Sequence, residues 1–155
     1  MLSFDTETNG LDVHHGARPF FVTICDVQGN QSFWEWDVDP LTRAVAVPTE
    51  DLKDIYQQLN DATELLAQNS KFDVAMLRAT FQDRSLPFSW NWDKTHDALI
   101  AGHLLASNKP HDLTSMAVQY LGQDIEPLEK ALEAAVKKCR SHCQHRLTEW
   151  RIAKN

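Results

Sequence analysis

Three segments near the start of the chain have the pattern of β-strands. Met1–Glu7 is a short apolar-rich run, Pro19–Val27 is rich in β-branched and aromatic residues, and Gln31–Trp36 alternates aromatic with polar positions. Gly29-Asn30 supplies a turn between the last two segments. The pattern therefore predicts a strand followed by an antiparallel hairpin.

Helical spacing of apolar residues follows a loop predicted at Asp37–Pro48. A helix is expected to begin at Thr49 because acidic residues come next and apolar residues repeat at helical spacing. Glu64–Gln68 then predicts a short strand, and Ser70 begins another helix. Further helices are predicted at Asp97–Ala106, Asp112–Leu121 and Glu126–Ala153, with a loop at Pro87–Trp92. The order βββαβα followed by helices predicts an α/β domain with a mixed sheet.

Length and composition favour a single globular domain over residues 1–155. Hydrophobic residues make up 43% of the chain, enough for a sizeable core. No apolar run approaches the roughly 20 residues that a membrane span needs, and no leader-like segment precedes the first strand. Three cysteines give no disulfide framework. These features predict a cytoplasmic protein that does not enter a membrane.

The net charge of −7 argues against a protein that coats nucleic acid by positive charge alone. It does not exclude an enzyme that grips a few nucleotides through metal ions. Carboxylates that hold divalent cations make a site acidic in sequence but far less so when the cations are bound.

The first candidate for chemistry is the pair Asp5 and Glu7. Residues two apart on a strand point to the same side, so both carboxylates project together near the strand's carboxyl end. Two carboxylates so close repel each other unless a cation lies between them. The alternative is chance, because this short pattern is common after apolar strands.

The second candidate is Asp73, in the first turn of the helix that begins at Ser70. The helix dipole favours a carboxylate there. If the strands Met1–Glu7 and Glu64–Gln68 are neighbours, Asp73 comes towards Asp5 and Glu7. Three carboxylates suit Mg²⁺ or Mn²⁺ rather than a soft metal. An ordinary acidic helix start remains the alternative.

Phe4–Leu11, with the sequence FDTETNGL, resembles the first motif of the DEDD exonuclease superfamily. Asn69–Asp73, NSKFD, resembles its second motif, and Asp97–Gly122 is similar to the two following helices in the exonuclease domain of bacterial and phage family A DNA polymerases. The resemblance covers residues 1 to about 122. It implies a ribonuclease H-like fold and removal of nucleotides from a 3′ end.

The resemblance also implies a role for individual residues. Asp5 would bridge two Mg²⁺ or Mn²⁺ ions, Glu7 would bind the first and Asp73 the second. The family positions that bind the terminal nucleotide or shape the floor of the site correspond here to Thr8, Leu11, Asn69 and Phe72. The implied partners are the 3′ end of single-stranded DNA and a DNA polymerase domain, in a bacterial or phage-infected cell.

The family's fourth carboxylate has no clear counterpart. Tyr120 and Asp124 match the spacing of the third motif, but Gly122 interrupts the helix that would hold both residues on one face. Glu149 is a weak substitute. We therefore expect the chain to end before its third motif.

Two other groups of residues have both a functional and a plain structural interpretation. Cys139, His142, Cys143 and His145 resemble zinc ligands, but all lie in one helical stretch, whereas structural zinc gathers ligands from separated clusters. The tryptophans at 34, 36, 90 and 92 are able to stack on bases, although large aromatic residues on strands usually belong to the core.

Three functions remain open from the sequence. The leading hypothesis is a metal-dependent 3′→5′ exonuclease that acts on DNA. A catalytically incomplete module that binds nucleic acid or supports a polymerase is the second, favoured by the missing fourth carboxylate. An RNA-trimming exonuclease with the same two motifs is the third, and only a comparison of substrates separates it from the first.

Overall fold

A computed structural model describes the backbone of residues 1–152 and the side chains of residues 1–141. The chain divides into two compact units, one spanning Met1–Ser107 and the other beginning at Asn108. Each unit is described separately. In the described part of the chain no helix is both long enough and apolar enough to cross a membrane.

The first unit is built on a five-stranded mixed sheet with the strand order β3-β2-β1-β4-β5. Strand β2 pairs antiparallel with both β1 and β3, whereas β4 pairs parallel with both β1 and β5. This confirms the predicted α/β fold with a mixed central sheet, and it is consistent with a ribonuclease H-like arrangement. The strands are β1 (Leu2–Thr8), β2 (Pro19–Asp26), β3 (Gln31–Glu35), β4 (Leu65–Ala67) and β5 (Thr95–Asp97).

The predicted helices are present with boundaries close to those expected. The α-helices are α1 (Thr49–Asp61), α2 (Ser70–Asp83), α3 (Ala98–Leu105), α4 (Leu113–Met116) and α5 (Glu126–Ile152). Short 3₁₀ turns, η1 (Val13–His15) and η2 (Trp92–Lys94), lie in the first unit, and α4 continues as a π-type segment, η3 (Ala117–Leu121). The two units therefore differ in secondary structure. The first contains the five strands, whereas the described elements of the second are all helical.

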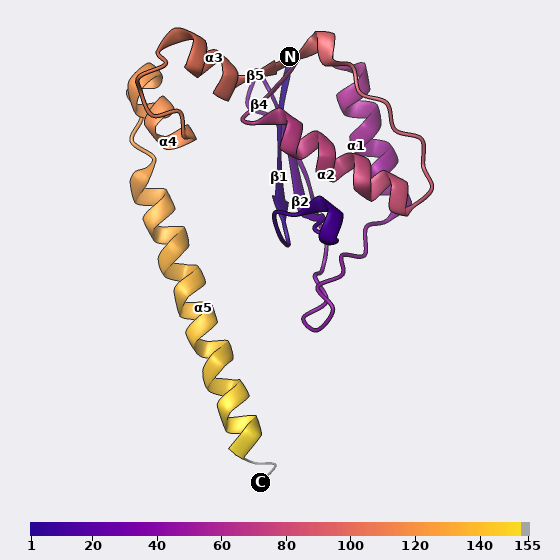
Figure 1. Ribbon diagram of the computed structural model, residues 1–155, viewed down its shortest axis with the longest axis vertical. Coiled ribbons are helices and arrows are strands. Elements are labelled where there is room, and N and C mark those ends of the chain that lie inside the picture. The colour runs from indigo at the N-terminus through magenta and orange to yellow at the C-terminus, as the bar shows by residue number, and fades with distance from the viewer. Residues whose placement is uncertain (153–155) are drawn as a thin grey trace. The chain divides into compact units, whose positions relative to one another are not determined.

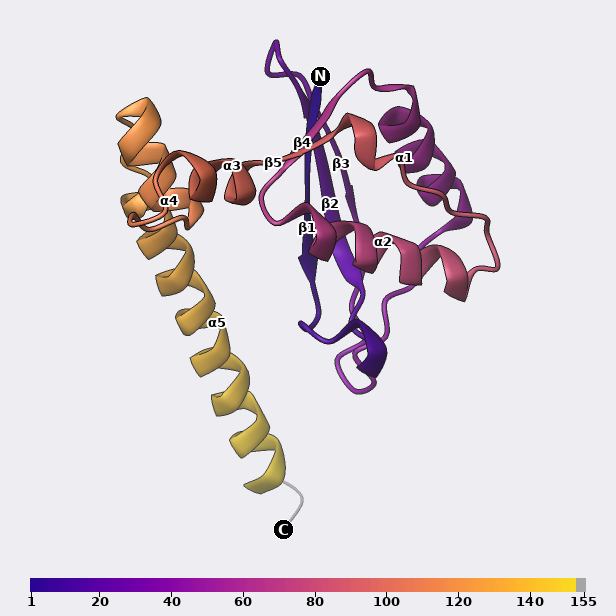
Figure 2. The same cartoon turned by 45° about the horizontal axis from the view of Figure 1, so that its top comes forward.

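Helices α1 and α2 lie on the same side of the sheet (Figures 1 and 2). The apolar phase of each central strand faces them, so Phe4 of β1 and Val22 of β2 join Leu52 of α1 and Leu77 of α2 in one buried cluster. Burial of such side chains is the main stabilising contribution to the unit. The opposite phase of β1 carries Asp5 and is exposed.

Most of the tryptophans belong to this core, as their usual role predicts. Trp36 is 7% exposed, and its indole Nε1 donates to Asp51 Oδ2 at 2.7 Å. Trp34 and Trp90 pack against the same cluster. Trp92 is the exposed one among these four, so base stacking by a row of tryptophans has no support in the structure.

Strand β5 is the element that the sequence did not reveal. Its three residues, Thr95–Asp97, are too short to show a period of two, and their apolar content is nil. Pairing with β4 defines the strand: Leu65 lies opposite Thr95, and Ala67 lies opposite Asp97. The tertiary context rather than local propensity therefore makes this segment extended.

Lys94 holds the end of α1 through three hydrogen bonds. The last turn of α1 contains no basic residue of its own, and its final carbonyls need partners. The Lys94 ammonium donates to the carbonyl oxygens of Leu59 at 3.1 Å, Asn60 at 2.5 Å and Ala62 at 2.8 Å. One side chain from η2 thus closes the helix and ties it to the segment before β5.

We predict that Lys94→Met lowers the free energy of unfolding by about 1–2 kcal/mol, because hydrogen bonds to a charged group are lost and three carbonyls are left without this donor. Chemical denaturation at constant pH measures the change. Lys53→Met, at an exposed position of the same helix, is the matched control and should alter stability by less than about 0.5 kcal/mol. Equal effects of the two substitutions would show that the Lys94 contacts do not stabilise the unit.

Candidate functional site

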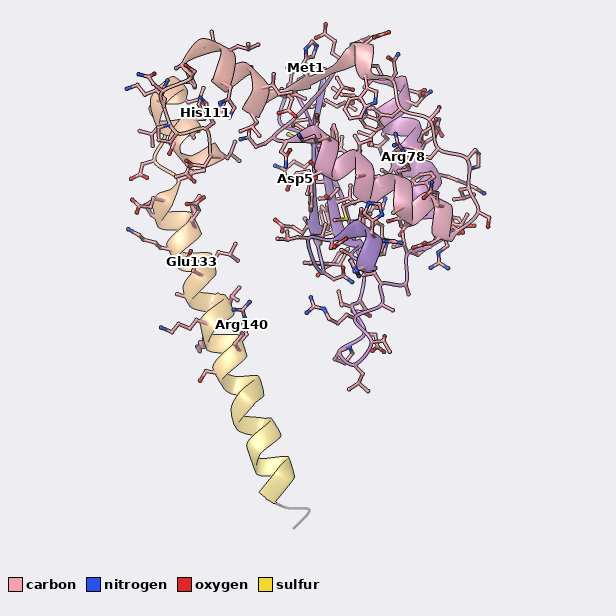
Figure 3. The ribbon with its side chains drawn as sticks, viewed as in Figure 1. Met1, Asp5, Arg78, His111, Glu133 and Arg140 are labelled. Atoms are coloured by element: carbon pink, nitrogen blue, oxygen red, sulfur yellow. The ribbon has the colours of Figure 1, made fainter. Side chains whose placement is uncertain are left out.

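Strand β1 presents Asp5 and Glu7 on the face of the sheet that α1 and α2 do not cover. Both side chains are exposed, whereas Phe4 and Thr6, in the other phase, are buried. Figure 3 labels Asp5 on the side of the sheet away from α2. Strand alternation thus places the two carboxylates together, as the sequence predicts.

Asp73 reaches the same strand from the opposite face. Its residue is 2% exposed, and its Oδ1 accepts two hydrogen bonds from Thr6, one from the backbone N–H at 3.1 Å and one from the hydroxyl at 2.6 Å. Thr6 lies between Asp5 and Glu7 in the chain. The three carboxylates therefore meet at one short stretch of β1, although Asp73 approaches it from the buried side.

The topology explains why residues 67 positions apart come together here. Strand β4 runs parallel to β1 but pairs with it at Leu2 and Ser3, so Thr6 lies beyond the carboxyl end of β4. The chain leaves β4, turns at Asn69 with a left-handed φ of 61°, and enters α2. The first turn of α2 delivers Asp73 to the amide that β4 does not reach.

The electrostatics of the three carboxyls show that they share one environment. Partial burial raises the pKa of Glu7, and the nearby Asp5 carboxylate raises it further. Burial raises the pKa of Asp73 from 3.8 to about 6; Asp5 also raises it, while the Thr6 hydrogen bonds oppose the shift. Asp5 therefore acts on both other carboxyls, as expected of like charges at close range.

Carboxylate oxygens are the donors that Mg²⁺ and Mn²⁺ prefer, so the chemistry of Asp5 and Glu7 fits these ions. The described side chains do not, however, form a complete set of metal ligands. Among the described side chains, no group of three or more His, Cys, Asp or Glu residues is placed to hold a metal ion. The Oδ1 atom of Asp73 accepts both hydrogen bonds from Thr6.

Among the candidate substrate-binding residues, Thr8 and Leu11 follow β1 directly. The Thr8 hydroxyl donates to the Gly10 carbonyl at 2.6 Å, and Leu11 is 85% exposed. Leu11 lies on a groove of about 450 Å³, where Arg43 and Asn9 exchange hydrogen bonds between side chain and backbone. The other lining residues include Asp12, His15 and Thr42. An exposed apolar side chain beside such a groove is suited to contact a base.

The remaining two candidates, Asn69 and Phe72, lie at the start of α2. Asn69 makes no side-chain cap, but its carbonyl accepts from the Phe72 amide at 2.9 Å. Phe72 is half-buried. Their positions next to Asp73 place both beside the candidate site, while their contact with a nucleotide stays a prediction.

Asp124, the candidate for the fourth carboxylate, is not held on one helix with Tyr120. Gly122 has a left-handed φ of 65° and ends the η3 segment, so Tyr120 and Asp124 do not share a helix. Asp124 belongs to the second unit, where its Oδ1 accepts from the Glu126 amide at 3.0 Å. The other candidate, Glu149, has its side chain outside the described residues.

The possible zinc ligands give no site among the described side chains. Cys139 is exposed, whereas the side chains of His142, Cys143 and His145 lie outside the described residues. The loop histidine His15 is also exposed, and its Nδ1 lies 2.6 Å from Asp12 Oδ2. A partner within its own turn accounts for its placement.

Two residues near the site were not singled out from the sequence. The signal for Thr6 was a polar residue in the same phase of β1 as the apolar Leu2 and Phe4. Asp97 was seen as a helix start, which is correct, but its contacts to Asn69 and Ser70 depend on β5 and so left no pattern in the sequence.

Comparison with solved structures gives distant likenesses, among them one to a DNA polymerase. No protein-family model matches the sequence, and no curated protein matches it either. The chain resembles part of the family B DNA polymerase from the hyperthermophilic archaeon Pyrobaculum calidifontis, with 16% sequence identity and a TM-score of 0.43. The match covers 56% of this chain and 11% of the polymerase chain. A likeness of this extent assigns the chain to no family.

The raised pKa of Asp73 predicts how stability depends on pH in metal-free buffer. Between about pH 4 and 6 the folded protein holds the proton and the unfolded chain has lost it, so the free energy of unfolding falls as pH rises through this window. Asp73→Asn keeps an oxygen acceptor for Thr6 without the charge. We expect it to be more stable than the wild type at pH 7, by at most about 3 kcal/mol.

Denaturant unfolding in the presence of a chelator measures this difference. The comparison has an internal control below about pH 3, where Asp73 is protonated in both the folded and the unfolded chain, so the two proteins should be equally stable there. If Asp73→Asn were the less stable protein at pH 7 without metal, the carboxylate would be stabilised by the fold, and the sign of the pKa shift would be wrong.

Proposed function

We propose that the first unit is the nuclease core of a metal-dependent 3′→5′ exonuclease that acts on DNA. The observation that supports this most directly is the position of Asp5, whose charge raises the pKa of both Glu7 and Asp73. Neighbouring carboxyls with raised pKa values at the end of a strand are typical of sites that bind a cation. The two exonuclease-like motifs supply exactly these three residues in the expected order.

In this proposal Asp5 and Glu7 hold divalent ions on the exposed face, and Asp73 contributes from the start of α2. Bound Mg²⁺ or Mn²⁺ would supply an activated water and neutralise charge on the reacting phosphate. The protein's own contribution is to hold the three carboxylates in place. Thr6 orients Asp73 through two hydrogen bonds, and strand alternation fixes the directions of Asp5 and Glu7.

In this proposal the groove beside Leu11 holds the terminal nucleotide. Leu11 follows β1 within the same turn as Thr8, so a base against its exposed side chain would bring the 3′ end of a strand towards Glu7. Arg43 adds a positive charge at the groove, suited to a phosphate. The single-stranded 3′ end is therefore the substrate we propose, and association with a DNA polymerase domain is part of the same proposal.

A second function has its own supporting observation. The described side chains contain no group of three or more His, Cys, Asp or Glu residues placed to hold a metal ion, and Asp124 does not share a helix with Tyr120. A chain of this kind would bind nucleic acid or support a polymerase without cutting. The experiment that follows separates the two functions.

The test incubates the chain with 5′-labelled single-stranded DNA in Mg²⁺, Mn²⁺ or chelator and follows shortening from the 3′ end. The wild type should give a metal-dependent ladder, which Asp5→Ala abolishes and Glu7→Gln slows by roughly 100-fold or more. The same assay with RNA of equal sequence distinguishes the RNA-trimming alternative.

Glu35→Gln is the matched control for Glu7→Gln. Glu7 lies opposite Phe21 and Phe21 lies opposite Glu35, so the two glutamates occupy one row on the same face of the sheet. The control should cleave at the wild-type rate. Binding of the DNA without metal-dependent cleavage would favour the non-catalytic module, and cleavage that survives Asp5→Ala would refute the proposed site.

A further inference from the structure

Asp97 accepts hydrogen bonds from the first residues of two different helices. Its Oδ2 accepts from the Ser70 amide and the Ser70 hydroxyl, both at 2.8 Å, and its Oδ1 accepts from the Asn69 amide at 3.0 Å. The same Oδ1 accepts from the Leu99 amide at 2.9 Å at the start of α3. One carboxylate thus accepts from backbone amides at the N-terminal ends of both α2 and α3.

The contacts to α2 replace a cap that the helix does not make for itself. Asn69 is its N-cap residue, but it has a left-handed backbone and no side-chain hydrogen bond to the first turn. Helix N-termini leave several amides without intrahelical partners, and a side-chain oxygen normally accepts from one of them. Asp97 provides this acceptor from a neighbouring strand.

The sheet places Asp97 where it is needed. Asp97 is the last residue of β5 and lies opposite Ala67, the last residue of β4. Because the strands are parallel, the end of β5 meets the turn that leads from β4 into α2. The negative charge also faces the positive ends of two helix dipoles. Burial tends to raise the Asp97 pKa, but hydrogen bonds from Ser70, Asn69 and Ile100 outweigh it and lower the pKa overall.

The first turn of α2 is therefore fixed at two points. Asp97 of β5 holds Asn69 and Ser70, and one turn later Thr6 of β1 holds Asp73. Figure 1 shows that α2 begins beside β4 and β5 and extends away from these strands. Loss of the first point would leave the second to hold the end of the helix alone.

We infer that Asp97 is a positioning residue for the candidate metal site, which sets the first turn of α2 and through it the place of Asp73. Asp97 does not itself contact the ions or the DNA in this account. The inference rests on the proposed function as far as the metal is concerned, while the effect on the helix and on Thr6 is independent of it.

The test measures two quantities in the full chain: the Mn²⁺ dissociation constant by calorimetry and the exchange rate of the Thr6 amide hydrogen by NMR. Asp97→Ala should weaken Mn²⁺ binding at least about tenfold, as loss of a residue that orients a ligand does. The Thr6 amide, which donates to Asp73, should exchange faster. Asp97→Asn keeps an oxygen that accepts from the amides, so its Mn²⁺ affinity and its Thr6 exchange rate should lie between those of the wild type and Asp97→Ala.

Asp112→Ala is the matched control. Asp112 caps α4 by accepting from the Ser115 amide at 2.9 Å, but it belongs to the second unit. The Asp112→Ala variant loses a comparable helix cap, that of α4, and should change neither the Mn²⁺ affinity nor the exchange rate of the Thr6 amide. If Asp97→Ala does not fold, the conservative Asp97→Asn and the milder Ser70→Ala supply the comparison.

The outcomes separate the inference from the proposed function. Wild-type affinity and wild-type Thr6 exchange in folded Asp97→Ala would overturn the inference. If the wild type itself bound no Mn²⁺, the proposed function would fail. The positioning role would then be decided by Thr6 exchange alone: faster exchange in Asp97→Ala supports it, and unchanged exchange overturns it.

Discussion

The candidate site depends on the pair of hydrogen bonds between Thr6 and Asp73. Strand β4 stops short of Thr6, so the Thr6 amide has no strand partner on that side, and the Asp73 carboxylate takes the place of one. A buried carboxylate with charged neighbours is costly, and the two donated hydrogen bonds offset part of that cost. This contact joins the carboxyl end of β1 to the first turn of α2 and so brings Asp73 to the strand that carries Asp5 and Glu7.

The sheet order determines which residues meet at that contact. Strands β1, β4 and β5 run parallel, so their carboxyl ends lie at one edge, where α2 begins and where Asp5 and Glu7 emerge on the open face. Ligand sites of α/β sheets form at such edges because loops and helix N-termini converge there. The raised pKa values of Glu7 and Asp73 follow first from burial and then from the nearby Asp5 carboxylate.

The sequence predicted strands β1–β4, the order of the helices and the position of Asp5 and Glu7 because these depend on local periodicity. It did not show β5, whose three residues are extended only through pairing with β4. Nor did it show that Asp73 would bind Thr6, since that contact joins residues 67 positions apart. Long-range pairing decides each of these features.

The central claim is that Asp5, Glu7 and Asp73 form one divalent-cation site. The most direct measurement is a crystal structure of the chain with Mn²⁺ and a nucleoside 5′-monophosphate, in which anomalous scattering locates the metal. We expect an anomalous peak bonded to Asp5 and Glu7, with Asp73 directed towards it and the nucleotide near Leu11. A peak bonded to other residues, or none at saturating Mn²⁺ in a correctly folded crystal, would contradict it.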